Sequence, residues 1–158
     1  MELDHHYAVR VVWQGDLGTG TSGYLRYSRA NEVTAAGKAH AIAGSSDRTF
    51  HGDRERWNPE ELLLAALSQC HMLSYLHVAT RHGIVVTAYS DDAVATMHQV
   101  GDGGAFTEAV LRPVVTIAAG DADLARRIHA EAARLCFIAS SVAFPIRHEP
   151  TIRVAQPE

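Results

Sequence analysis

The stretch NPEELLLAALSQCHM, residues 58–72, decides how this chain folds. It opens with a strong helix start, because the Asn58 side chain accepts hydrogen bonds from free backbone N–H groups and a proline follows at the first helical position. Glu61 lies three residues after the cap, as in a capping box. The helix is expected to run to about His82, where Gly83 closes it. Its apolar residues lie on most sides, which predicts burial at the centre of the core or of a dimer.

The rest of the chain has strand-like and helix-like patterns, without a repeat or a linker that would divide it. A second long helix is expected from Asp121 to about Ser140, capped by an aspartate and ended by Phe144-Pro145. Runs of β-branched and aromatic residues predict strands. These strands are 7–13, 22–29, 36–43, a long strand 84–100 that forms a hairpin with 106–118, and 151–155. This order of elements is typical of α+β proteins.

The bulk composition fits one globular domain. The chain has 158 residues and 47% of them are hydrophobic, enough for a sizeable core, so we expect a single domain over 1–158. The formal net charge is −4 and the arginines are scattered, which gives no electrostatic reason to expect a nucleic acid partner. We find no charged-then-apolar leader and no long uncharged apolar run, so we expect a cytoplasmic protein without a membrane partner.

Two cysteines, one on each expected helix, are the first candidates for chemistry. Cysteine is often simply a small buried residue, and this interpretation stays open for Cys70 and Cys136. Packed helices have axes about 8–10 Å apart, whereas a disulfide needs Cα atoms about 4.4–6.8 Å apart, so a disulfide is possible without being required. A reactive thiol also needs a positive neighbour that favours the thiolate. The loop before the first helix offers Arg48, Arg54 and Arg56.

The ten histidines raise the alternative of a metal site. Cys70 and His77 are seven residues apart, as are His129 and Cys136. In a helix this spacing separates the partners by about 10 Å along the axis, whereas zinc holds each ligand atom at about 2.0–2.3 Å. One metal does not fit both members of either pair, and we expect no metal and no cofactor. His77 and His129 are expected to be buried or interfacial polar groups, each with a partner.

The segments Asn58–Leu63 and Ser68–Met72, with Cys136 on the second expected helix, resemble the signature of the OsmC/Ohr family. This family comprises osmotically inducible protein C-like and organic hydroperoxide resistance-type thiol peroxidases. The order of the expected elements is similar over nearly the full length of the chain. His71-Met72 follows Cys70 where better-known branches carry an aromatic residue, which indicates a less familiar branch.

The resemblance implies an α+β, OsmC-like fold with antiparallel sheets around two long central helices. It also implies an intertwined homodimer with two active sites at the subunit interface. Cys70 would attack the peroxide and become a sulfenic acid, and Cys136 would resolve it as a disulfide. Glu60 matches the family's glutamate that orients an arginine towards the reactive sulfur. We favour Arg56 as that arginine because it precedes the helix closely, with Arg48 as the other candidate.

The same resemblance implies organic hydroperoxides as substrates, a dithiol system as reductant and peroxiredoxin-like activity. Two other functions remain open on this fold. One is a non-enzymatic module that binds a small apolar ligand, with the cysteines as packing residues. The other is a redox sensor whose oxidised form changes a partner interaction.

Overall fold

The structure, a computed structural model, describes residues 2–156. Its contacts divide the chain into two compact units, which meet between Leu62 and Leu63. The first unit has one β-sheet, and the second has two sheets and most of the helical structure, so the expected α+β class is confirmed. The single domain expected over 1–158 stays a prediction.

The first unit contains one antiparallel sheet in the order β1 (Arg10–Trp13), β2 (Asn31–Thr34) and β3 (Ile42–Gly44), followed by the 3-10 turn η1 (Arg48–Phe50). The strand expected at 22–29 is wrong, because this stretch forms turns and bends instead. The guanidinium of Arg29 donates to the carbonyls of Tyr24 and Tyr27 at 2.7 Å and lies over both rings, which holds the backbone in a compact turn.

Within residues 2–62 the structure describes no buried large apolar side chain. All four residues of β1 are exposed, although three of them are Val11, Val12 and Trp13. A small sheet without an apolar core is at best marginally stable in water. The first unit therefore has apolar side chains exposed on its surface.

The long helix α1 (Pro59–Arg81) begins and ends as the sequence predicts. The Glu61 backbone N–H donates to the Asn58 side chain at 2.8 Å, and the Asn58 N–H donates to the Glu61 carboxylate at 3.2 Å. These two bonds form the expected capping box. Gly83 has a φ of 68°, a left-handed conformation that glycine adopts without steric cost.

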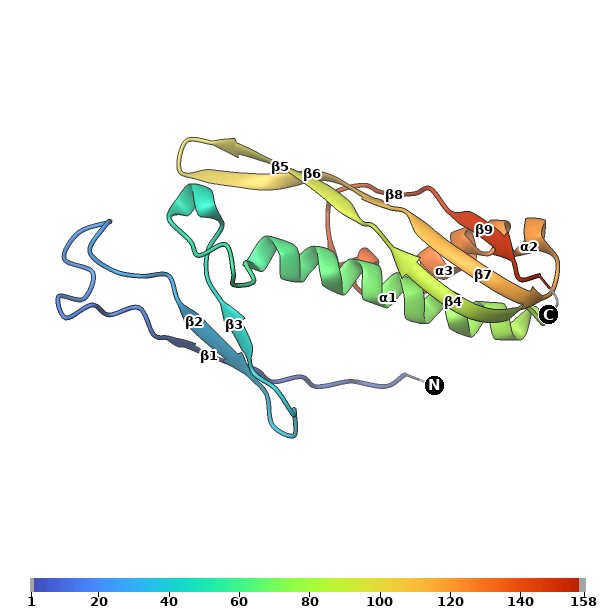
Figure 1. Cartoon of the computed structure of the whole chain (residues 1–158), viewed down its shortest axis with the longest axis horizontal. Coiled ribbons are helices and arrows are strands. Elements are labelled where there is room, and N and C mark those ends of the chain that lie inside the picture. Colours follow the sequence, from blue (N-terminus) through green and yellow to red (C-terminus); the bar gives the residue numbers. More distant parts are fainter. Residues whose placement is uncertain (1, 157–158) are drawn as a thin grey trace. The chain divides into compact units, whose positions relative to one another are not determined.

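The second unit contains two mixed sheets, shown as one long twisted ribbon in Figure 1. The expected hairpin is confirmed, but each of its arms is divided between the two sheets because the ribbon bends at Asp91 and Arg112. The Asp91 carboxylate accepts from the Arg112 N–H and from the Ser68 hydroxyl, both at 2.6 Å, and fixes this bend. The sheets have the orders β4 (Val85–Asp91), β7 (Pro113–Ala119), β9 (Thr151–Val154), and β5 (Val94–Val100), β6 (Gly103–Leu111), β8 (Ile146–His148).

The expectation of antiparallel sheets holds for the hairpin and fails for the last two strands. β8 and β9 lie parallel to β6 and β7. The segment between β7 and β8 contains helices and crosses over, as a parallel connection requires. The last strand lies where the sequence predicts it, whereas β8 was not predicted. The strand expected at 36–43 is wrong except for its last two residues, because 35–41 connects β2 to β3.

The prediction of a second long helix is wrong. The segment is divided into α2 (Ala122–Arg127) and α3 (His129–Leu135). The backbone departs from regular helical geometry at Ile128, where ψ is −10°, and both Ile128 and His129 are buried at this break. Cys136 therefore does not lie within a helix. It ends α3 in an extended conformation, and its carbonyl accepts from the N–H and hydroxyl of Ser140 at 3.1 Å, near the short turn η2 (Ala139–Ser141).

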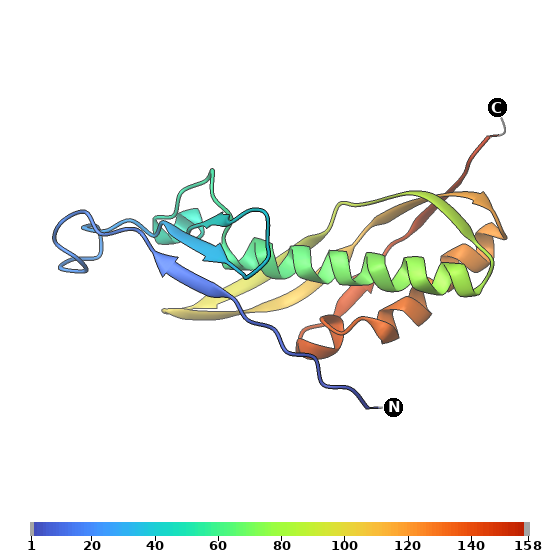
Figure 2. The same ribbon diagram turned by 90° about the horizontal axis from the view of Figure 1, so that it is seen from below.

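The core of the second unit lies between one face of α1, the sheet β4-β7-β9 and the helices α2 and α3. Figure 2 shows α2 and α3 on one side of α1. Buried residues on α1 are Leu67, His71, Tyr75, Val78 and Ala79, a single helical stripe. Cys70, Leu73 and His77, which the sequence places at helical spacing, lie outside this stripe.

By length and composition alone, α1 is apolar enough to cross a membrane. In the second unit, however, one of its faces packs into the protein core and carries the polar side chains of His71 and Tyr75. Core helices of globular proteins commonly have such composition, and we interpret α1 in this way. The absence of a membrane span stays a prediction.

The capping box gives a test of how strongly α1 depends on its first turn. Asn58→Ala removes the acceptor of the Glu61 N–H, and we expect it to lower the free energy of unfolding by about 1 kcal/mol. Asn58→Asp keeps an acceptor at the same position and serves as the matched control. Urea unfolding at a fixed protein concentration measures both. Equal stability of the alanine variant and the native chain would show that this cap contributes nothing.

Candidate dithiol site

The two cysteines are free and lie next to each other in the second unit. Cys70 is half-buried on α1, and Cys136 is buried at the end of α3. Burial raises the pKa of the Cys136 thiol, and a hydrogen bond with the Cys70 side chain raises it further. Cys136 is therefore held as a protonated thiol at neutral pH, close to the thiol of Cys70.

The position of Cys136 is fixed by its own neighbourhood in the chain. Its sulfur accepts from the Ala139 N–H at 3.4 Å, and its carbonyl accepts from Ser140. These bonds occupy the backbone where α3 stops, so the thiol projects from a defined break between two helical segments.

Cys70 opens onto an apolar pocket of about 440 Å³. The pocket is lined by Cys70, Leu73, Ser74, His77, Leu135 and Phe137. The Phe137 side chain is 78% exposed and that of Leu73 is 57% exposed, so the apolar walls of the pocket face solvent. A small apolar molecule therefore fits beside the Cys70 thiol.

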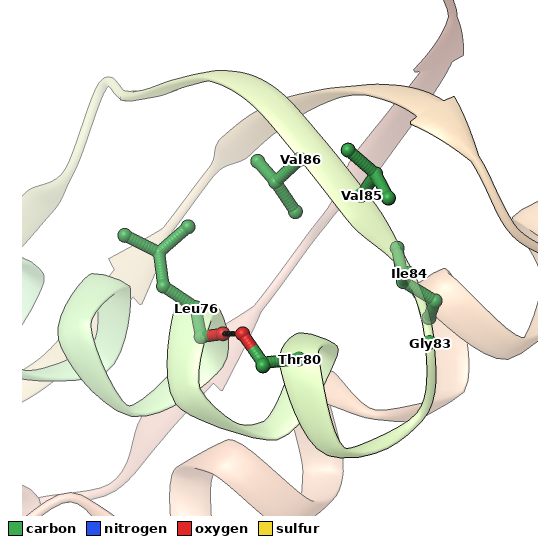
Figure 3. Close-up of a pocket in the computed structure, with 6 residues that line it drawn as sticks. All are labelled: Leu76, Thr80, Gly83, Ile84, Val85 and Val86. Carbon is green, nitrogen blue, oxygen red and sulfur yellow. Dashed lines mark hydrogen bonds between the residues drawn. The ribbon is translucent and has the colours of Figure 1, made fainter.

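A second pocket of about 350 Å³ lies where α1 ends and β4 begins (Figure 3). Leu76 and Val86 extend into the space between helix and strand, and Gly83 and Ile84 form the turn. The Thr80 hydroxyl donates to the Leu76 carbonyl at 3.0 Å, so it is already bonded within the helix. This pocket has no nucleophile or titratable group in its lining, and we do not place chemistry there.

The predicted arginines and Glu60 belong to the first unit. Arg48 and Arg56 line the same pocket of about 270 Å³, so the structure brings these two candidates together. Arg56 donates to the Asn31 carbonyl at 3.3 Å and lies 3.8 Å from the Asp53 carboxylate. One carboxylate oxygen of Glu60 is buried without a hydrogen-bond partner among residues 2–156. Activation of Cys70 by either arginine stays a prediction.

The structure contains a buried cluster of histidines that the sequence did not predict. His71 Nε2 and His129 Nδ1 are joined by a hydrogen bond of 2.9 Å, and the His148 ring lies 4.2 Å from that of His71. The His129 ring also stacks on Tyr75 at 4.0 Å. The expectation that His129 is buried with a partner is confirmed, whereas His77 is exposed and lines the cysteine pocket. The four-residue spacing of Leu67, His71 and Tyr75 was the available signal.

Burial dominates the electrostatics of this cluster. Burial, with a smaller contribution from neighbouring positive charge, lowers the pKa of His71 to about 3 and that of His129 to about 4. Burial also lowers the pKa of His148, with Asp91 opposing the shift. Among the residues that the structure describes, no group of three potential ligands is arranged to hold a metal ion. The expectation of no metal stays a prediction.

Fold and site together define an α+β protein with two neighbouring thiols at an apolar pocket. The family model for OsmC-like proteins matches residues 51–151. The chain therefore belongs to the OsmC-like protein family, as its sequence motifs indicated. No curated protein matches the chain.

Solved structures support the same fold. An OsmC-like protein of unknown function from Vibrio cholerae is 29% identical, with a TM-score of 0.82, and the match covers 93% of this chain and 99% of that one. Organic hydroperoxide resistance proteins from Elizabethkingia anophelis and Legionella pneumophila are each 16% identical, with TM-scores of 0.66 and 0.63. Those matches cover 97% and 95% of this chain, and 100% and 99% of the others.

The buried histidines predict loss of stability in acid. Their folded pKa values lie below the value of about 6.5 in the unfolded chain, so the unfolded state binds protons first as the pH falls. The stability that they contribute is present above pH 6.5 and is lost between pH 6.5 and the folded values. For His71 and His129 together we expect about 4 kcal/mol less stability at pH 5 than at pH 7.

Urea unfolding at pH 7, 6 and 5 measures this loss. Carboxylates titrate mostly below this range, so the histidines dominate it. His98→Gln removes an exposed histidine and is expected to leave the pH dependence unchanged. A free energy of unfolding that stays constant from pH 7 to pH 5 would contradict the neutral, buried pair.

Proposed function

We propose that this protein is a two-cysteine thiol peroxidase that reduces organic hydroperoxides. The observation that carries the proposal is the proximity of the Cys70 and Cys136 thiols, with Cys70 open to an apolar pocket. Membership of the OsmC-like family supports it, since two structures of the same fold are named organic hydroperoxide resistance proteins. The reductant would be a dithiol, and the setting would be the reducing cytoplasm.

In the first step the Cys70 thiolate attacks one oxygen of the hydroperoxide. A sulfur–oxygen bond forms, the O–O bond breaks, and the alkoxide leaves and takes up a proton to become an alcohol. Cys70 becomes a sulfenic acid. The pocket walls Leu73, Leu135 and Phe137 favour a peroxide with an apolar body.

In the second step Cys136 resolves the sulfenic acid. The Cys136 sulfur attacks the Cys70 sulfur, a disulfide forms, and the sulfur–oxygen bond breaks. The hydroxide that leaves combines with the proton of the Cys136 thiol as water. Because burial keeps that proton on Cys136 until this step, the thiol supplies the proton that the leaving group requires. A dithiol then reduces the disulfide by exchange and restores both thiols.

A positive side chain must favour the Cys70 thiolate, and we propose Arg56, or Arg48 in its place. The unpartnered, buried oxygen of Glu60 supports this assignment, because such an oxygen is a strong site for a guanidinium group. In the proposed dimer the arginine can come from either protomer. Glu60 would then orient the arginine towards the reactive sulfur, as the resemblance to the OsmC/Ohr family implies.

We further propose a homodimer. The first unit has no buried large apolar side chain in residues 2–62, and the cysteine pocket has exposed apolar walls. A second copy of the chain covers both surfaces in an intertwined arrangement, and burial of apolar area is the main driving force of such association. The alternative function, a non-enzymatic module that binds a small apolar ligand, is supported by the volume of the cysteine pocket.

Substitution of each cysteine separates the two steps of the proposed reaction. Cys70→Ser is expected to abolish consumption of an organic hydroperoxide, measured by loss of peroxide in the presence of a dithiol. Cys136→Ser is expected to give one turnover and then stall as the sulfenic or a higher acid, detected by mass spectrometry. Peroxide consumption at the native rate by the Cys70→Ser variant would remove Cys70 from the mechanism.

The homodimer is tested by the mass of the protein in solution. We expect twice the mass of one chain by light scattering, because the strand β1 is otherwise left with exposed valines. Val11→Lys places a charge at a side chain that is 62% exposed in the protomer and is expected to weaken the dimer. Val11→Thr keeps the branched shape and is the matched control. A native chain with the mass of a monomer would contradict the proposal.

A further inference from the structure

The hydrogen bond between His71 and His129 joins the two segments that carry the cysteines. His71 directly follows Cys70 on α1, and His129 is the first residue of α3, which Cys136 ends. α3 has seven residues, so the bond and Cys136 lie at opposite ends of a short rigid rod of about 10 Å. The hydrogen bond therefore fixes the start of α3 against α1 at the residue next to Cys70.

This bond is deeply buried. The His71 side chain is 0% exposed and that of His129 is 3% exposed. Neither the second nitrogen of His71 nor that of His129 has a partner among residues 2–156. The bond of 2.9 Å is thus the polar contact that both rings make, and its loss leaves a buried nitrogen without a partner.

The surroundings hold the rings in place but supply no replacement for this bond. Tyr75 stacks on His129, and its hydroxyl donates to the Ala125 carbonyl at 3.0 Å. His148 packs against His71, Arg126 repels a proton on His129, and Asp91 acts on His148. The rings are therefore held neutral, in van der Waals contact on their faces and in one hydrogen bond at their edges.

We propose that His71 and His129 are positioning residues that keep Cys70 and Cys136 in register for disulfide formation. The proposal rests on the dithiol of the proposed function and deepens it, because it concerns the second step alone. A turn of α1 about its axis, or a shift of α3 along it, breaks the histidine bond and separates the sulfurs. While the bond is intact, the Cys136 sulfur faces Cys70, so the disulfide forms with little further movement.

The variants His71→Gln and His71→Asn form a matched pair. The amide nitrogen of glutamine lies at the same distance along the side chain as Nε2 of histidine, so it reaches His129 Nδ1. The amide of asparagine is one carbon shorter and does not reach. Both variants are neutral and polar, so they differ mainly in whether the bond survives. His82→Asn shortens the side chain in the same way and removes an exposed hydrogen bond of 2.9 Å between His82 Nε2 and Glu131. It is the control for a surface link between the end of α1 and α3.

The experiment measures the equilibrium constant for the Cys70–Cys136 disulfide against reduced and oxidised dithiothreitol. Free thiols are trapped by alkylation and counted by mass spectrometry. In this exchange the protein dithiol is oxidised, two protein thiol protons pass to the reagent, and the reagent disulfide is reduced. Circular dichroism confirms that each variant is folded. Because no peroxide is present, the result does not depend on peroxidase activity.

We expect His71→Asn to lower the constant about tenfold, since it loses a buried hydrogen bond. We expect His71→Gln and His82→Asn to stay within about twofold of the native chain. Peroxide stopped-flow adds the second readout, in which His71→Asn forms the Cys70 sulfenic acid at the native rate and then converts it slowly to disulfide. A merely structural role would change both steps together.

Equal constants for the asparagine and glutamine variants would overturn the inference, and so would a native chain that forms no such disulfide. A native chain that forms the disulfide with dithiothreitol but consumes no hydroperoxide would overturn the proposed function and leave the positioning role standing. The two failures are therefore distinguishable.

Discussion

The packing of α1 against α3 is the constraint on which the rest of this structure depends. A single stripe of α1, from Leu67 to Ala79, packs into the core of the second unit. This stripe includes the polar residue His71 among its apolar residues. This packing decides that Cys70 faces outward to a pocket while His71 faces inward to His129. A rotation of α1 by one residue, about 100°, would exchange these roles and bury the thiol in place of the imidazole.

The same packing makes the two thiols chemically different. Cys70 is half-buried beside an apolar pocket, whereas Cys136 is enclosed and its pKa is raised. Two thiols in identical environments would have the same reactivity. The different environments suit Cys70 to the proposed attack on the peroxide and Cys136 to the proposed resolution. The break after Leu135 contributes to this difference, because it turns Cys136 out of helical geometry and supplies the Ala139 N–H to its sulfur.

The sequence predicted the first helix well and the second poorly, for physical reasons. The limits of α1 follow from local chemistry at Asn58, Glu61 and Gly83, which the sequence states directly. The break at Ile128 depends on tertiary burial, and no glycine or proline at this position indicates it in the sequence. The inward face of α1 was equally hidden, because a helix that is apolar on most sides gives no periodic signal to separate Cys70 from His71. The neighbouring cysteines were anticipated from the family resemblance, and the histidine pair was missed because its members are 58 residues apart.

The most direct test of this account is to identify the sulfur that each cysteine bonds after oxidation. The native protein is treated with one equivalent of an organic hydroperoxide, digested without reduction and examined by tandem mass spectrometry. We predict one peptide pair per chain, linked through Cys70 and Cys136 and formed within a single protomer. Linkage between protomers, or two cysteines that remain free while other residues are oxidised, would contradict it.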